Sequence, residues 1–277
     1  MFTTLALGLR RLIILVDAVG KNKIARWAEL ETFGNVIQPE TSQITGKDHS
    51  IKGKWRESVF FNFNPIVLEL ACGKGEYTTG LAEIFHERNF IGVDIKGSRM
   101  WRGAKTANEK ELKNTAFLRT RIEFINSFFK EDEVDEIWIV FPDPHTGKRN
   151  SNKRLTSSWF LNKYRLIMKE GGLIHLKTDN IELYRYTERL AQNNGLEIIK
   201  STSDLYGEAF SKGLPFFNFL PYLTDEPLTD EISNKIISLR THYENLYLKE
   251  GLKICFLSFK IDKKIIFNEE WQNVRSE

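Results

Sequence analysis

The chain has 277 residues, 41% of them hydrophobic, and is therefore long enough to bury a sizeable core in one large domain. Its net charge is only +3, so any contact with nucleic acid has to rest on local clusters of basic residues. Two distant cysteines and five histidines without ligand spacing exclude a disulfide framework, predict no metal site and suit a reducing cytoplasm.

The first 19 residues form an apolar stretch that Arg10 and Arg11 interrupt and Asp17 closes. No small-residue cleavage site is clear, so we expect an extra amphipathic segment or a stretch upstream of the true translation start, with an export signal as the less favoured interpretation. No apolar run reaches the roughly 18 residues that a membrane span needs, and we expect no membrane association. Residues 20–64 interleave basic and aromatic side chains and predict an N-terminal arm with short helices, one of them at 23–33.

From residue 65 onward, strands are expected to alternate with helices, which indicates a doubly wound, mostly parallel α/β sheet spanning residues 65–264. The last two strands, separated by a long insertion, predict an antiparallel edge, and residues 265–277 are expected to be a tail. The seven expected strands lie at 66–71, 90–95, 115–122, 136–141, 172–177, 196–202 and 252–261. The expected helices lie at 76–86, 99–112, 157–168 and 181–193 and near 125–129 and 230–249, and Gly195 is expected to end the fourth of them.

A glycine loop, ELACGKGE at residues 69–76, joins the first strand to the first helix. Gly73 and Gly75 let the backbone turn tightly and approach a ligand at the helix N-terminus. A dinucleotide motif would have a third glycine where this chain has Thr78, and the acid Glu69 does not suit a pyrophosphate. A ligand with an ammonium and a sulfonium, such as S-adenosylmethionine (SAM), suits Glu69 better, and a solvated acid at a strand end is the alternative.

Asp94 ends the second strand, where a carboxylate can accept hydrogen bonds from both ribose hydroxyls. Nicotinamide and SAM enzymes share this feature, so Asp94 alone does not discriminate between them. A helix N-cap is its alternative role.

The fourth strand ends in VFPDPHTGKRNSNKRLT, residues 140–156. Pro142 and Pro144 restrict the backbone around Asp143, so we expect its carboxylate to point toward the same rim as Glu69 and Asp94. An acid in an ordinary turn is the alternative. The loop that follows is too polar to pack as core and is either a solvated surface loop or a phosphate-binding loop. Its candidate phosphate ligands are Lys148, Arg149, Lys153 and Arg154.

Two later segments carry further candidates. GLIHLKTD, at 172–179, is an apolar strand that ends in Asp179. In THYE, the side chains of Thr241 and Glu244 are three residues apart and share a helix face, where they form either a capping box or a substrate-binding pair.

Together and in this order, ELACGKG, GVDIKGSR, FPDP with its basic loop through NKRLT, HLKTDN and THYE resemble the bacterial tRNA (guanine-N7-)-methyltransferases. The resemblance covers roughly residues 20–262, and its most specific part is FPDP with the basic loop. It implies the Rossmann-like fold of class I SAM-dependent methyltransferases, SAM as methyl donor, tRNA as partner and no metal. The implied reaction forms N7-methylguanosine at position 46 in the variable loop of tRNA, in the cytoplasm, by a monomer or homodimer whose arm 20–64 helps to bind tRNA.

The resemblance also implies site residues. Glu69, Gly73, Gly75 and Asp94 match the SAM-binding positions, Asp143 matches the SAM-contacting residue of the active site, and Asp179, Thr241 and Glu244 match substrate-binding positions. Two positions depart from the family pattern. Arg121 stands where the family often has Asp or Asn near the adenine, and FPDPHTGK replaces FPDPW plus Lys, leaving Lys148 as the nearest substitute for the substrate lysine.

Guanine N7 has an in-plane lone pair and no proton, so its methylation needs positioning and no general base. We expect Asp143 to position the reactants and to stabilise the developing positive charge. Asp179 and Glu244 are expected to accept hydrogen bonds from guanine N1–H and the 2-amino group.

Three alternatives remain at this point. The first is a SAM-dependent enzyme that acts on another RNA or on an exocyclic amine, and the second is a non-catalytic RNA-binding relative. The third is a nicotinamide-dependent dehydrogenase, which Glu69 and Thr78 disfavour.

Overall fold

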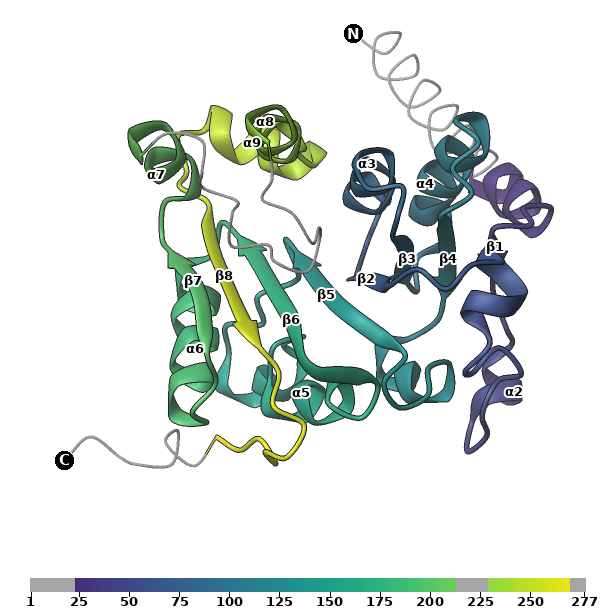
Figure 1. The fold of residues 1–277 in the computed structure, drawn as a ribbon, viewed down its shortest axis with the longest axis horizontal. Coiled ribbons are helices and arrows are strands. Elements are labelled where there is room, and N and C mark those ends of the chain that lie inside the picture. The colour runs from purple at the N-terminus through teal and green to yellow at the C-terminus, as the bar shows by residue number, and fades with distance from the viewer. Residues whose placement is uncertain (1–22, 213–228, 270–277) are drawn as a thin grey trace, which may run out of the picture.

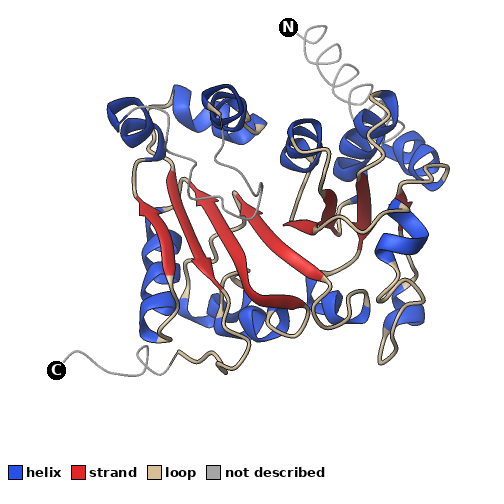
Figure 2. Cartoon of the chain, viewed as in Figure 1, coloured by secondary structure: helices blue, strands red, loops and turns tan. Residues whose placement is uncertain are grey.

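The computed structural model describes residues 23–212 and 229–269 and contains one twisted sheet with helices on both faces (Figure 1, Figure 2). The strand order is β1-β4-β3-β2-β5-β6-β8-β7. Strands β1 to β6 pair in parallel, and β8 runs antiparallel to both β6 and β7. The strands are β1 (Val36–Ile37), β2 (Ile66–Leu70), β3 (Asn89–Asp94), β4 (Thr115–Arg119), β5 (Val134–Val140), β6 (Met168–Thr178), β7 (Ile198–Thr202) and β8 (Cys255–Lys260). The predicted fold class is thereby confirmed.

Alternation along the strands divides the core into two layers, because successive side chains point to opposite faces of a sheet. In β2, Leu68 packs in the layer that contains α5 (Ser158–Tyr164) and α6 (Ile181–Asn193). Val67 packs in the other layer, with side chains of α3 (Glu76–Ile84), α7 (Leu205–Lys212) and α8 (Asp230–Ser238). Helix α4 (Gly97–Glu109) covers the same face near β4 through a smaller cluster around Phe117.

The N-terminal arm is built into the α/β body. Residues 23–31 are helical, as expected, and are followed by β1, α2 (Thr41–Ile44) and the π-helix η1 (Arg56–Phe60). Strand β1 pairs with β4 and extends the sheet to eight strands, one more than predicted. Trp55 is fully buried, stacks on Phe129 with ring centroids 5.2 Å apart and donates from Nε1 to the carbonyl of Phe128 at 2.9 Å.

Two expected elements differ from the structure. The strand expected at 115–122 ends at Arg119, and the 3-10 helix η2 (Ile122–Ser127) follows it. The single helix expected near 230–249 is two helices, α8 and α9 (His242–Lys249), because the chain is extended at Leu239 and Thr241. The other predicted elements are present with end shifts of a few residues, and Gly195 follows α6 with a left-handed φ of 69°.

The α8–α9 pair packs on α3 (Figure 1). Leu239 fills the space beside Gly80, where a Cβ atom would lie 2.2 Å from Leu239 Cδ1. The backbone N–H of His242 donates to Glu76 Oε1 at 3.2 Å. These contacts bring the late part of the chain beside the glycine loop.

Segments 1–22, 213–228 and 270–277 fall outside the described residues, so the expected N-terminal extension and most of the expected tail are not part of this description. Within the described residues, no helix has both the length and the apolar character that crossing a membrane requires.

Candidate active site

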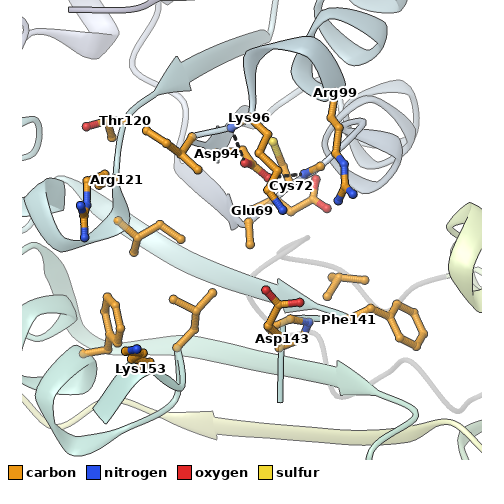
Figure 3. Close-up of a pocket in the computed structure, with 18 of the residues that line it drawn as sticks. Glu69, Cys72, Asp94, Lys96, Arg99, Thr120, Arg121, Phe141, Asp143 and Lys153 are labelled. Carbon is orange, nitrogen blue, oxygen red and sulfur yellow. Dashed lines mark hydrogen bonds between the residues drawn. The ribbon is translucent and has the colours of Figure 1, made fainter. Parts of the chain in front are cut away.

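A cleft of about 770 Å³ opens at the carboxyl ends of β2, β3, β4 and β5 (Figure 3). The strand ends supply Glu69, Asp94, Thr120 and Asp143 to its lining, and the start of α9 supplies Thr241 and Tyr243. In parallel sheets, ligands bind at this edge. After the ligands that the sequence leads us to expect, we call the part lined by β2 to β4 the cofactor side and the part lined by Asp143, the basic loop and α9 the guanine side.

The two glycines of the glycine loop have different roles. Gly73 lines the cleft at φ +56°, and a Cβ atom there would meet nothing within 4 Å, so a ligand can approach its backbone. Gly75 begins α3 at φ +67°, and a Cβ atom there would lie 2.6 Å from the ring of Phe117. Gly75 therefore serves the packing of α3 against the sheet, and it does not line the cleft.

Glu69 is a buried acid, with 6% of its surface accessible at the floor of the cofactor side. Thr78 donates to its Oε2 from both the backbone N–H, at 2.7 Å, and the hydroxyl. Burial raises the pKa of the Glu69 carboxyl to about 8, although the two Thr78 hydrogen bonds oppose this rise. The solvated-acid alternative therefore does not describe Glu69.

Asp94 is held in place by two backbone groups. The N–H of Gly73 donates to Oδ2 at 2.9 Å, and the N–H of Lys96 donates to Oδ1 at 2.7 Å. The N-cap position of α4 is Lys96, so Asp94 is not the N-cap residue. The carboxylate oxygens lie at the cleft with further lone pairs that can accept hydroxyl groups.

Asp143 is exposed, and its carboxylate points toward Glu69 and Asp94 across the cleft (Figure 3). The chain turns sharply on both sides of it, because Phe141 and His145 have left-handed φ angles of 48° and 42°. Such angles are uncommon in residues other than glycine and have to be held by surrounding contacts. One such contact is the hydrogen bond from the Phe141 N–H to the Lys177 carbonyl at 2.8 Å. The direction of Asp143 thus depends on β6 as well as on the flanking prolines.

The basic loop contains the short 3-10 helix η3 (Lys148–Lys153). Lys153 lines the cleft and is exposed. Arg154 donates from Nε to the carbonyl of His145 at 3.1 Å, and its guanidinium lies 4.1 Å from the ring centroid of Tyr186. Arg154 therefore supports the loop in addition to any contact it makes with phosphate. The side chains of Lys148 and Arg149 are outside the described part of the structure.

Arg121 and Asp179 follow the ends of β4 and β6. Arg121 lines the cleft, with 60% of its side chain accessible, and pairs with Glu123 at 2.9 Å. Asp179 is partly buried, which raises the pKa of its carboxyl, and it does not line the cleft.

Thr241 and Glu244 form the capping box that the spacing allowed. The hydroxyl of Thr241 accepts from the Glu244 N–H at 3.1 Å, and Glu244 Oε2 accepts from the Thr241 N–H at 3.3 Å. Thr241 lines the cleft, but Glu244 is fully buried and pairs with Lys177 Nζ at 2.5 Å. Its carboxylate is therefore not at the cleft surface, and the interpretation of Glu244 as a guanine acceptor does not fit this geometry.

Three residues of the site region were missed from the sequence. Tyr243 and Trp159 line the cleft with 46% and 44% of their surfaces accessible, and Lys177 is buried behind the guanine side. Tyr243 lies inside the THYE motif, between the two residues that were singled out. The position of Trp159 at the start of α5, directly after the basic loop, was an available signal. Lys177 had none, since a lysine in a strand usually faces solvent.

Among the residues that the structure describes, no three His, Cys, Asp or Glu side chains gather in a way that could hold a metal ion.

Comparison with known proteins agrees with the geometry. A family described as "Putative methyltransferase" matches residues 63–213. The fold is similar to that of the 16S rRNA methyltransferase KamB, with a TM-score of 0.52 at 13% sequence identity over 77% of this chain and 95% of that chain.

Curated relatives are much closer in sequence. The tRNA (guanine-N(7)-)-methyltransferase of Christiangramia forsetii is 44% identical over 87% of this chain and 98% of its own length. The proteins of the same name from Bacteroides fragilis and Porphyromonas gingivalis are 39% and 44% identical, over 89% and 83% of this chain and 88% and 86% of their own lengths. The chain belongs to the tRNA (guanine-N(7)-)-methyltransferase family.

Proposed function

We propose that this protein methylates N7 of a guanine in tRNA, at position 46 in the variable loop, with SAM as the methyl donor. The observation that carries the proposal is the placement of Asp143 across the cleft from Glu69 and Asp94, beside a basic loop. The names of the curated relatives support the choice of tRNA and of guanine N7. The reaction belongs to the cytoplasm, and the chain acts as a monomer or homodimer.

The cofactor side fits SAM. Glu69 is a carboxylate whose burial makes ionisation costly, so a ligand cation beside it would be favourable. The open backbone at Gly73 admits a ligand, and Asp94 offers acceptors for two ribose hydroxyls. Arg121 lines the same side and is our candidate for the adenine end, where its exposed guanidinium can lie over the base.

When bound, SAM supplies the methyl group: a bond forms from the N7 lone pair to carbon as the sulfonium C–S bond breaks, leaving S-adenosylhomocysteine and a cationic 7-methylguanine. N7 carries no proton, so the chain needs no base for this step. Asp143 holds the purine in place and stabilises the positive charge that develops on it, which is worth most where water is excluded. Thr241 and Tyr243 would contact the base or its sugar at the guanine side.

The tRNA backbone would lie along the basic loop. Lys153 lines the cleft and is exposed, which supports a contact with phosphate, and Lys148, Arg149 and Arg154 are proposed as its neighbours in this role. Asp179 is kept as a proposed substrate ligand outside the cleft lining, where it would contact the nucleotides next to the guanine.

The test is methyl transfer from labelled SAM to tRNA that lacks the modification, followed by borohydride–aniline cleavage to map N7-methylguanosine. We expect cleavage at the variable loop, and a family member of known activity serves as positive control. Incorporation of label without cleavage there would point to another position or base. No incorporation, with the control active, would overturn the proposal.

A further inference from the structure

Lys177 is a buried cation that the reaction described above does not use. Only 2% of its side chain is accessible, and its Nζ lies 2.5 Å from Glu244 Oε1. The same atom donates to the hydroxyls of Tyr77 at 2.8 Å and Tyr206 at 3.2 Å, and the Tyr206 hydroxyl donates to Glu244. Burial lowers the pKa of Lys177, and Glu244 opposes this change. A buried charge is tolerated when it is paired and hydrogen-bonded in this way.

The guanine side has two walls, the segment from Phe141 to Asp143 and the first turn of α9. The main chain of Lys177 contacts the first wall. Val140 and Lys177 are register partners in β5 and β6, and the Lys177 carbonyl accepts from the N–H of Phe141 at 2.8 Å. Phe141 is the left-handed residue two positions before Asp143. The position of β6 at Lys177 therefore helps to set the direction of the reactive carboxylate.

The side chain of Lys177 acts on the second wall, the first turn of α9, through Glu244. Its partner Glu244 closes the capping box with Thr241 and fixes the first turn of α9. That turn presents Thr241 and Tyr243 to the cleft. Phe141 from the first wall and Tyr247 from α9 lie with ring centroids 5.7 Å apart.

Neither Lys177 nor Glu244 lines the cleft. We propose that Lys177 and Glu244 are positioning residues, a buried pair that sets Asp143 and the start of α9 relative to each other around the guanine. This inference rests on the proposed function, since it assigns the guanine side of the same cleft. In this proposal Glu244 does not contact guanine itself. It fixes the turn that presents Thr241 and Tyr243, and these residues contact the base.

A double-mutant cycle tests the pair with Lys177→Met, Glu244→Gln and the combined variant. Each single change leaves the other charge buried without its partner, so we expect kcat/KM for tRNA to fall by about 10- to 100-fold. The combined variant has neither charge and is expected to recover at least about tenfold relative to the product of the two losses. SAM affinity is expected to stay within about threefold of wild type throughout, because the cofactor side is intact.

The matched control is Glu136→Gln, in a buried pair that joins β5 to β6 two residues before Lys177. Glu136 Oε1 lies 3.0 Å from His175 Nε2, and both side chains are fully buried. We expect this variant to lose thermal stability as well, but to keep kcat and the KM for tRNA near wild type below the melting temperature. Equal losses of kcat/KM in Glu136→Gln and Lys177→Met would show a general stability effect and would overturn the proposal.

Two further outcomes decide the matter. If Glu244 touches guanine itself, Glu244→Gln lowers activity equally with Lys or Met at position 177, and the absence of coupling rejects the positioning role. Tyr206→Phe, which removes one hydrogen bond to Glu244, carries the test if Lys177→Met does not fold, and a smaller loss of kcat/KM with unchanged SAM affinity is expected.

Hydrogen exchange keeps this test separate from the proposed function. Lys177→Met should reduce protection of the Phe141 amide and of the amides at the start of α9, with no change at the glycine loop, whether or not the wild type methylates tRNA. Unchanged protection would reject the pair as a positioning device. If protection changes in Lys177→Met but the wild type does not methylate tRNA, the proposed reaction is rejected and the positioning role of the pair is retained.

Discussion

The cofactor side and the guanine side of the cleft are built in different ways. On the cofactor side, the groups that hold the two acids come from at most 21 positions away in the chain: Thr78 donates to Glu69, and backbone groups of Gly73 and Lys96 fix Asp94. On the guanine side, the contacts join residues far apart, such as Lys177 with Glu244 and Phe141 with Tyr247. The site proposed for SAM, a ligand shared by many enzymes, is therefore built around a short loop. The site proposed for guanine, the ligand specific to this family, depends on contacts that exist only in the complete fold.

The largest effect is expected on the guanine side, from Asp143→Asn. The substitution keeps the size of the side chain and removes its charge, so kcat should fall by about 100-fold or more. SAM affinity should fall much less, by about tenfold at most, because Asp143 is only one of the expected SAM contacts and the cofactor side is untouched. Single-turnover methyl transfer and calorimetric SAM titration measure the two quantities. Glu87→Gln, an exposed acid before β3 at the opposite edge of the sheet, is the control, and wild-type kcat in Asp143→Asn would contradict the assignment.

The two loop glycines sharpen the description of the cofactor side. Gly75→Ala combines a left-handed φ with a Cβ atom 2.6 Å from Phe117, and we expect a loss of about 2–4 kcal/mol in the free energy of unfolding. Gly73→Ala has a left-handed φ and open space, so a loss of about 1–2 kcal/mol is expected. Denaturant titration measures the free energy of unfolding of both variants. Equal losses would show that the ring of Phe117 moves aside without an energetic penalty.

Glu69→Gln tests the cofactor side by charge. Removing a charged hydrogen-bond partner of the ligand should weaken SAM binding by about 10- to 100-fold. Glu69 has a pKa raised to about 8, so its carboxyl is mostly protonated below that pH and has to lose the proton when a cation binds beside it. SAM affinity should therefore rise with pH up to about 8 and then level off.

The proton can be counted directly. Calorimetry in buffers with different ionisation enthalpies should show proton release on SAM binding at pH 7 in the wild type. Glu69→Gln should show none and a flat pH profile. Thr78→Val, which removes the hydroxyl hydrogen bond that lowers this pKa, should move the midpoint to higher pH. A pH-independent affinity in the wild type would disprove the coupling.

The smallest effect is expected from Lys153→Ala, at the outer end of the guanine side. Loss of one phosphate contact should raise the KM for tRNA a few-fold and lower the slope of log affinity against log salt by about 0.7–0.9. Lys264→Ala is the control, since this exposed lysine follows β8 and lies at the opposite edge of the sheet. The same slope in both variants would remove Lys153 from the tRNA interface.

The sequence was sufficient for the sheet and for most of the cofactor side. Apolar strands that end in Glu69 and Asp94 predict one rim, because parallel strands carry their carboxyl ends to the same edge. Strand β1 was missed because Val36 and Ile37 are too few for any periodicity. The break between α8 and α9 was missed although Thr241 was recognised as a possible cap.

The guanine side could be predicted only in part. Asp143 stood out through its prolines, but the turn that directs it depends on the left-handed Phe141 and on a carbonyl of β6. Glu244 was taken for a ligand because the THYE motif matches substrate-binding positions of the family, and its buried partner Lys177 lies on a different element. No sequence pattern around Lys177 or around Glu244 predicts that these two residues form a buried pair.

The contact of the α8–α9 pair with α3 also sets an order of events during synthesis. Glu76 and His242 are 166 residues apart, so the ribosome releases the glycine loop long before the segment that packs beside it. A nascent chain that has released only the glycine loop therefore lacks the contact of Leu239 with Gly80 and the start of α9 beside the cleft. The guanine side can be completed only after α9 has also been released, because Glu244 and Tyr247 follow Leu239 in the chain.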